Sequence, residues 1–113
     1  MQPESLGGAP MKRETFEEIA KRFHLLSEPT RLLILFHLGS EKLAVGEIVQ
    51  RTGASQSNVS KHLAVLHTGG IVQRQRSGTS VLYSVADTSI FQLCDIVCGG
   101  IEQVLEERRR AMR

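Results

Sequence analysis

Residues 55–63 read Ser-Gln-Ser-Asn-Val-Ser-Lys-His-Leu, and this stretch decides how the rest of the chain is interpreted. Ser55 is a favourable N-cap, and Val59, Leu63 and Leu66 recur at helical spacing, so the stretch predicts a helix with one apolar face. Short polar side chains stand at the N-terminal end of that helix. This combination suits a helix whose N-terminal end enters the major groove of DNA, where glutamine can pair with adenine.

The segments before this helix also show helical spacing. Residues 29–38 begin at a proline, which is tolerated in the first turn of a helix, and residues 45–53 predict a short helix that closes at its final glycine. Further upstream, Thr15 and Glu18 form a capping box, which predicts the start of a helix that runs to about Ser27. Three helices therefore precede the polar one.

The period of the apolar residues changes after the helix that starts at Ser55. Residues 71–76 and 81–85 are short β-type runs, and the polar segment 77–80 between them contains a glycine, which together predict a hairpin. Asp87 can cap a final helix. The architecture expected from this order is mainly α with a small β-hairpin, a helix-turn-helix followed by a wing.

Length and composition limit the organisation of the chain. The chain has 113 residues, of which 41% are hydrophobic, so one domain with one core is expected. We expect residues 1–13 to form a flexible N-terminal arm and residues 14–110 to form the domain. The longest apolar run, residues 32–36, is far shorter than the roughly 20 residues of a membrane span, and no apolar leader is seen, so a cytoplasmic protein without a membrane partner is expected.

Charge is distributed unevenly along the chain. The formal net charge is +2, yet the segment 48–86 contains no Asp or Glu and carries Arg51, Lys61, Arg74 and Arg76. An acid-free basic segment is typical of a surface that binds a polyanion, and here it coincides with the polar helix and the hairpin. The residues predicted to contact DNA are Ser55, Gln56, Ser57, Asn58, Ser60, Lys61, His62, Arg74, Arg76 and Thr79.

Three motifs carry a resemblance to a known family. Residues 27–32 (Ser-Glu-Pro-Thr-Arg-Leu), 45–48 (Val-Gly-Glu-Ile) and 55–63 make the chain similar to the ArsR/SmtB family of winged-helix transcriptional regulators over about residues 15–105. The resemblance implies a homodimer formed by the first and last helices, with the fourth helix reading a palindromic operator in double-stranded DNA. It also implies repression that an inducer relieves.

The final helix independently favours a dimer. Eight apolar positions follow its helical period almost without a break, and so small a chain has little use for such a stripe unless a partner covers part of it. Gly99 and Gly100 lower the helix propensity there and would permit a close helix approach. The residues expected at the dimer interface are Phe16, Ile19, Phe23, Ile90, Leu93, Val97, Ile101, Val104 and Leu105.

The metal sites that the resemblance implies are incomplete in this chain. The family's Cys-x-Cys motif on the third helix is absent, because residues 43–47 contain no thiol. The family's zinc site on the last helix retains Asp87, but Ser89 stands where a histidine would be, and Gly100 and Gln103 replace later ligands. Neither site can therefore be assumed to supply the inducer.

Cys94 and Cys98 are the remaining candidates for an effector site. At positions i and i+4 they share one helix face, where two thiolates could hold a soft ion such as As(III), with a third ligand from the partner chain or solvent. Thiol oxidation or a persulfide could act on the same pair. Alternatively, both cysteines lie on the apolar stripe and only pack there, leaving a regulator without a ligand. No other cofactor is expected.

An enzyme is not expected. The spacing Cys-x-x-x-Cys differs from the Cys-x-x-Cys of thiol oxidoreductases, and no βαβ pattern surrounds it. Ser60 and His62 are two residues apart on a helix and face different directions, so they cannot form a nucleophile and base pair. The other alternative is a winged helix that binds a protein rather than DNA.

Overall fold

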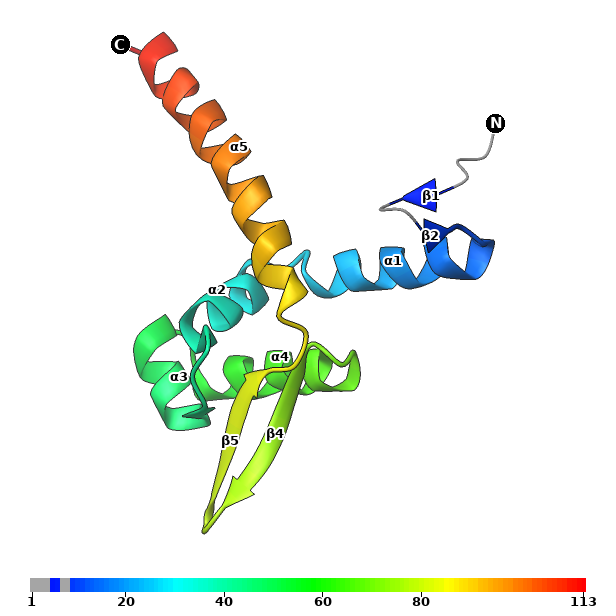
Figure 1. The fold of residues 1–113 in the computed structure, drawn as a ribbon. Coiled ribbons are helices and arrows are strands. Elements are labelled where there is room, and N and C mark those ends of the chain that lie inside the picture. The colour runs from blue at the N-terminus through cyan, green and yellow to red at the C-terminus, as the bar shows by residue number, and fades with distance from the viewer. Residues whose placement is uncertain (1–4, 7–8) are drawn as a thin grey trace.

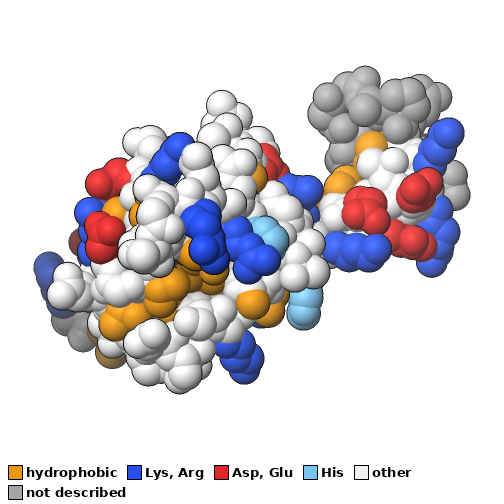
Figure 2. Space-filling view, turned by 90° about the horizontal axis from the view of Figure 1, so that it is seen from below, with side chains coloured by type: hydrophobic (Ala, Val, Ile, Leu, Met, Phe, Trp, Pro, Cys, Tyr) orange, Lys and Arg blue, Asp and Glu red, His pale blue; other side chains and the backbone are white. Residues whose placement is uncertain are grey.

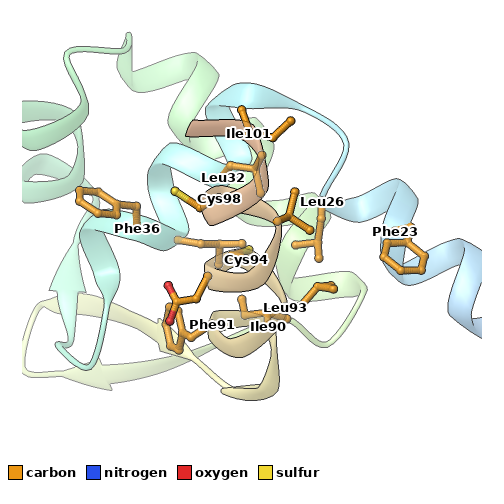
Figure 3. Close-up of a pocket in the computed structure, with 13 residues that line it drawn as sticks. Phe23, Leu26, Leu32, Phe36, Ile90, Phe91, Leu93, Cys94, Cys98 and Ile101 are labelled. Atoms are coloured by element: carbon orange, nitrogen blue, oxygen red, sulfur yellow. The ribbon is translucent and has the colours of Figure 1, made fainter. Parts of the chain in front are cut away.

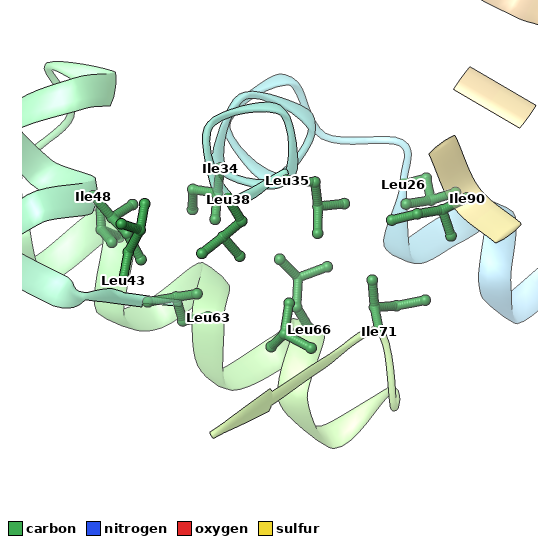
Figure 4. Close-up of a cluster of buried hydrophobic side chains, with 12 residues drawn as sticks. Leu26, Ile34, Leu35, Leu38, Leu43, Ile48, Leu63, Leu66, Ile71 and Ile90 are labelled. Atoms are coloured by element: carbon green, nitrogen blue, oxygen red, sulfur yellow. The ribbon is translucent and has the colours of Figure 1, made fainter. Parts of the chain in front are cut away.

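Apolar residues at helical spacing bring three helices together in the centre of the molecule (Figure 1). The structure, a computed structural model, describes residues 5–6 and 9–113. The three central helices are α2 (Pro29–Leu38), α3 (Val45–Thr52) and α4 (Gln56–Thr68). Their inward side chains form one core, in which the largest fully buried residues are Ile34, Leu38, Ile48, Leu63, Leu66, Ile71 and Val59 (Figure 4).

Side chains at the helix ends explain where α2 and α4 begin. The carboxylate of Glu28 accepts a hydrogen bond from the backbone N–H of Arg31 at 3.0 Å, and Ser55 Oγ accepts one from the N–H of Asn58 at 3.2 Å. Each bond satisfies an amide that the first turn of a helix leaves free. Helix α3 ends at Gly53, whose φ of +73° is left-handed and favours glycine. The central helices expected from the sequence are confirmed.

The predicted hairpin is confirmed and belongs to a three-stranded sheet. Strands β4 (Val72–Ser77) and β5 (Ser80–Val85) are antiparallel, and β3 (Leu43–Ala44) pairs with the other edge of β5. The chain reverses between β4 and β5 at Gly78, which has a φ of +63°. Figure 1 shows this hairpin, hereafter the wing, extending beyond the helices. Five helices and an antiparallel hairpin give the winged helix-turn-helix order.

Helix α1 (Arg13–Leu25) begins earlier than the capping box predicts. Lys12 occupies the N-cap position without a side-chain hydrogen bond, so Thr15 and Glu18 lie inside the first turns rather than at the boundary. The helix also ends before Ser27, because Leu26 turns into the core. In the predicted arm, β1 (Ser5–Leu6) pairs with β2 (Ala9–Pro10); residues 1–4 and 7–8 lie outside the described residues.

Helix α5 (Ser89–Ala111) extends away from the core (Figure 1). Ile90 is its one buried residue. Thr88 takes the N-cap position that the sequence assigned to Asp87. Asp87 Oδ1 nevertheless accepts hydrogen bonds from the backbone N–H and hydroxyl of Ser89, and Oδ2 contacts the guanidinium of Arg22 on α1. The hydrogen bond from the Ser89 hydroxyl, helped by Arg22, lowers the pKa of Asp87. One carboxylate therefore ties α1 to the start of α5.

Among the described residues, no helix combines the length and the apolar character that a membrane span requires.

Candidate nucleic-acid interface

The N-terminal half of α4 presents polar side chains to solvent. Its apolar residues point into the core, which leaves the opposite face exposed. Because Ser55 caps the helix, the first turn is well formed and its remaining amide groups and positive dipole end are available to an anion. The predicted contact residues on this exposed face are Ser55, Gln56, Ser57, Asn58, Ser60 and Lys61.

His62 differs from the prediction that placed it at the DNA surface. Its side chain is turned inward, 9% of the residue's surface is exposed, and its Nε2 lies 3.5 Å from Oε2 of Glu28. The cause is the helical period, because residue 62 falls on the same face as Val59, Leu63 and Leu66. His62 therefore belongs to the packing between α4 and the start of α2.

The wing carries two cations on one side. Arg74 and Arg76 alternate with Gln73 and Gln75 along β4, so the two guanidinium groups share one face, and both side chains are exposed. Thr79, also predicted at the interface, is exposed at the tip of the wing. The wing can therefore present positive charge beyond the body of the molecule.

Lys42 is a wing residue that sequence reasoning missed. Its Nζ donates a hydrogen bond to Oε1 of Gln75 at 3.1 Å, which places a third cation beside the hairpin. The local sequence hides it, because Lys42 lies outside the acid-free segment and directly follows Glu41. The strand β3 that follows Lys42, through its pairing with β5, brings this part of the chain to the wing.

The basic residues of the acid-free segment are not equivalent. Arg51 forms an ion pair with Glu41, with NH1 2.6 Å from Oε2, and the hydrogen bond lowers the pKa of Glu41. Within the described residues, Lys61, Arg74 and Arg76 make no ion pair. Seen from the end that carries the wing, a group of blue Lys and Arg side chains stands near the middle of the body with no red acidic side chain between them, and further blue side chains lie at the edges (Figure 2). Three unpaired cations are thus available to phosphates.

A groove of about 430 Å³ lies between α2 and α5, and both cysteines line it (Figure 3). Cys94 is partly buried, Cys98 is exposed, and nearly all the other lining residues are apolar. Burial raises the pKa of the Cys94 thiol, and the negative charges of Asp95 and of Cys98 as a thiolate act in the same direction. Cys94 is therefore a poorer source of thiolate at neutral pH than an ordinary exposed cysteine.

The protomer does not complete a metal site around these thiols. In the part of the chain that the structure describes, no three His, Cys, Asp or Glu side chains are grouped to hold a metal ion. A third ligand to an ion held by Cys94 and Cys98 must come from outside the protomer. The donor set present is two sulfur atoms, which suits a soft thiophilic ion rather than a hard cation.

Most residues predicted at the dimer interface form an uncovered apolar face on α1 and α5. Phe16, Phe23, Val97, Ile101, Val104 and Leu105 are exposed, and Ile19 and Leu93 are partly buried. Ile90 differs from the prediction, because the first turn of α5 lies over the core and buries it. At Gly99 and Gly100 an added Cβ would meet no neighbour, so no close helix approach occurs there within the protomer.

Helix α2 adds to this apolar face. Phe36 is 75% exposed and lines the groove together with Leu32, although neither was assigned to the interface from the sequence. A signal was present, because residues 32–36 are the longest apolar run and supply more apolar side chains than one face of α2 can bury. The uncovered surface therefore spans α1, α2 and α5.

The chain is similar in sequence to bacterial regulatory proteins. Residues 28–74 match the family described as "Bacterial regulatory protein, arsR family". The HTH-type transcriptional regulator NmtR of Mycobacterium tuberculosis is 37% identical over 87 residues, which are 77% of this chain and 72% of that protein.

Two solved structures are similar over almost their whole length. The crystal structure of Rv0081 from M. tuberculosis has a TM-score of 0.72 and 31% identity, covering 86% of this chain and 98% of that one. The solution structure of the homodimeric winged helix-turn-helix DNA-binding domain Mb0332 from Mycobacterium bovis has a TM-score of 0.72 and 28% identity, covering 90% and 95%.

Proposed function

Because this chain belongs to the ArsR family of bacterial regulatory proteins, we propose that it is a homodimeric repressor that binds operator DNA in the cytoplasm. The family consists of DNA-binding transcriptional regulators, and the chain is one of these rather than an enzyme. The observation that carries the proposal is the juxtaposition of an open, capped α4 N-terminus with a wing that holds unpaired arginines. Helix α4, the reading helix, contacts base edges, and the wing contacts phosphates.

The form that binds the operator is a dimer of two copies of the chain. Helices α1 and α5 bury little against their own protomer, and their exposed apolar residues need cover. A twofold dimer through these helices presents two reading helices to successive major grooves, about one helical turn of DNA apart. The operator is accordingly palindromic. The homodimeric Mb0332 domain, similar over 95% of its length, supports this assembly.

The inducer in this proposal is a thiophilic ion such as arsenite, held by Cys94 and Cys98. The two thiols lie on one face of α5 and line the groove beside the dimer face, so a bound ion would alter the packing of the dimer helices. Thiol oxidation or a persulfide would act at the same place. The raised pKa of Cys94 and its apolar surroundings favour a third candidate, a regulator whose cysteines only pack.

Substitutions on the reading helix and the wing separate base reading from phosphate binding. Lys61→Ala and Arg76→Ala should weaken binding to all duplexes and reduce the salt dependence, each by about two units of log–log slope, one for each protomer of the dimer. Gln56→Ala should also relax base preference at one position, by about 1 to 3 kcal/mol. Fluorescence anisotropy at several salt concentrations measures both effects.

The control for this series is Lys21→Ala, which removes an exposed cation from α1, where it pairs with Glu18. Its affinity and salt slope should equal those of the unsubstituted protein. Unchanged operator affinity in all three test variants would contradict the placement of the interface. Binding without salt dependence would instead favour a winged helix that recognises protein.

Removal of both thiols tests the inducer. Arsenite should release the reduced dimer from its operator, whereas the Cys94→Ser, Cys98→Ser double variant should bind DNA normally and remain bound. Because the pKa of Cys94 is raised, release should become faster as the pH rises past the range in which an exposed thiol ionises. Operator release is followed by anisotropy during titration with arsenite, cadmium, zinc or a persulfide donor.

The single variants Cys94→Ser and Cys98→Ser show whether both sulfur atoms are needed. If a persulfide donor releases the operator and the metal or metalloid ions do not, the inducer acts by covalent modification of the thiols rather than by ion binding. Normal release of the double variant by arsenite would establish that these cysteines are packing residues.

A further inference from the structure

His62 is a buried polar residue on the inner face of the reading helix. Among the described residues it is the one buried side chain of polar type, and its Nε2 lies 3.5 Å from Oε2 of Glu28. Within the same part of the chain, no other α4 side chain makes a hydrogen bond or ion pair with a different helix or strand. The Glu28–His62 contact is thus, among the described residues, the one polar side-chain contact between the reading helix and another part of the fold.

Glu28 stands where three helices meet. The same carboxylate oxygen that faces His62 accepts the backbone N–H of Arg31 at 3.0 Å in the first turn of α2. The guanidinium of Arg31 donates in turn to the carbonyl oxygen of Leu25, the last residue of α1, at 3.3 Å. Glu28 is therefore held by the α1–α2 junction, and through His62 it connects that junction to α4.

The remaining contacts of the inner α4 face are apolar. Val59, Leu63 and Leu66 pack in the common core. Apolar contacts have no preferred direction, so they fix the distance between α4 and α2 more closely than they fix the rotation of α4 about its own axis. A buried polar contact requires defined distances and angles, and in other proteins it fixes register at little net gain in stability. The apolar core supplies the stability, and the polar pair can supply the orientation.

We propose that Glu28 and His62 form a positioning pair that sets the rotation of the reading helix and so aims its polar tip at base edges. The inference rests on the proposed reading of DNA by α4. Ser57 and Ser60 protrude on the face opposite His62, and Gln56 and Asn58 are exposed on the first turn, so a rotation of α4 about its axis moves these side chains relative to a bound duplex. Phosphate contacts from the wing tolerate such a rotation better than base contacts do, because they depend on charge more than on angle.

The hydrogen bonding of the ring supports a role other than stability. Nδ1 of His62 is buried and has no hydrogen-bond partner. Whichever ring nitrogen carries the hydrogen of the neutral ring, Nδ1 remains unpaired inside the protein, which costs free energy in the folded state. An apolar side chain of similar size would avoid that cost. A histidine chosen for packing alone is therefore not the most stable choice at this position.

Two substitutions break the contact from its two ends. His62→Leu removes the ring but retains apolar volume, and Glu28→Ser is too short to reach His62 yet remains a favourable N-cap for α2. Affinities are measured by anisotropy for a duplex that the unsubstituted dimer selects from randomised DNA, and for a scrambled duplex of the same composition. Each variant should lower the ratio of the two affinities about 10-fold, roughly the effect of one mismatched base pair.

Affinity for the scrambled duplex should stay unchanged, and the melting temperature of His62→Leu should not fall. The double variant should lose no more than either single variant, because both remove one interaction. His62→Gln, which retains an N–H donor, should recover most of the ratio. The matched control is His67→Leu on the same helix, where the ratio should not change.

A His62→Leu protein with an unchanged affinity ratio would overturn the proposal, and so would losses that add in the double variant. If His62→Leu does not fold, the comparison of Glu28→Ser with His62→Gln decides the question. An unsubstituted dimer that selects no duplex would refute the proposed function itself. If the unsubstituted dimer selects a duplex but the variants show the same affinity ratio as that dimer, only the inference about Glu28 and His62 is refuted.

Discussion

Replacement of Ile101 by glutamate is expected to dissociate the dimer and to weaken operator binding by about 100-fold or more. Ile101 is 51% exposed in the protomer and lies beside Val97 on the stripe of α5 that a second copy covers. A carboxylate at this position must be stripped of water when the apolar faces meet, and nothing in the stripe offers it a partner. Each protomer would then present one reading helix to half of a palindrome.

The matched control is Ile96→Glu, which introduces the same charge on the same helix. Ile96 is 76% exposed and lies on nearly the opposite side of α5, away from the stripe. Analytical ultracentrifugation and operator binding are measured on both variants at equal protein concentration. A dimeric Ile101→Glu protein with full operator affinity would show that the interface lies elsewhere.

Replacement of Leu63 by alanine should cost about 2 to 5 kcal/mol in the free energy of unfolding. Leu63 is fully buried between α4 and the other central helices, and the core around it is built from aliphatic side chains that cannot collapse completely into the space left behind (Figure 4). Urea unfolding followed by circular dichroism measures the loss. Because assembly contributes to stability, protomer concentration must be the same for all variants.

Leu33→Ala is the control for this change, since it deletes the same atoms from a side chain that is 39% exposed on α2. Its cost should be less than half that of Leu63→Ala. Equal costs for the two variants would contradict the assignment of the core to the inner faces of α2, α3 and α4.

The helices were predictable where the chain carries its own boundary signals. Pro29 begins α2, Ser55 caps α4 and Gly53 closes α3, and each acts through its nearest neighbours in sequence. The hairpin was predictable for the same reason, because Gly78 lies between two β-type runs. Local rules of this kind require no knowledge of the rest of the fold.

The features that sequence reasoning missed depend on distant contacts. Strand β3 has only two residues and forms because it pairs with the free edge of β5. Its own sequence therefore contains no signal that predicts a strand. Ile90 was assigned to the dimer face because it continues the stripe of α5, but the path from β5 lays the first turn of that helix over the core. His62 was predictable in part, since residues 59, 62, 63 and 66 follow a 3-1-3 pattern that places the ring inside.

Helices α1 and α5, which project from the core, make the resistance of the chain to proteases depend on its concentration. Newly made chains at low concentration have no partner for α1 and α5, and their apolar side chains and backbone remain accessible to proteases. As copies accumulate, pairing covers these segments, which we expect to slow their proteolysis. We therefore expect the monomer to be cleaved faster than the dimer, so that the half-life of the chain rises with its concentration.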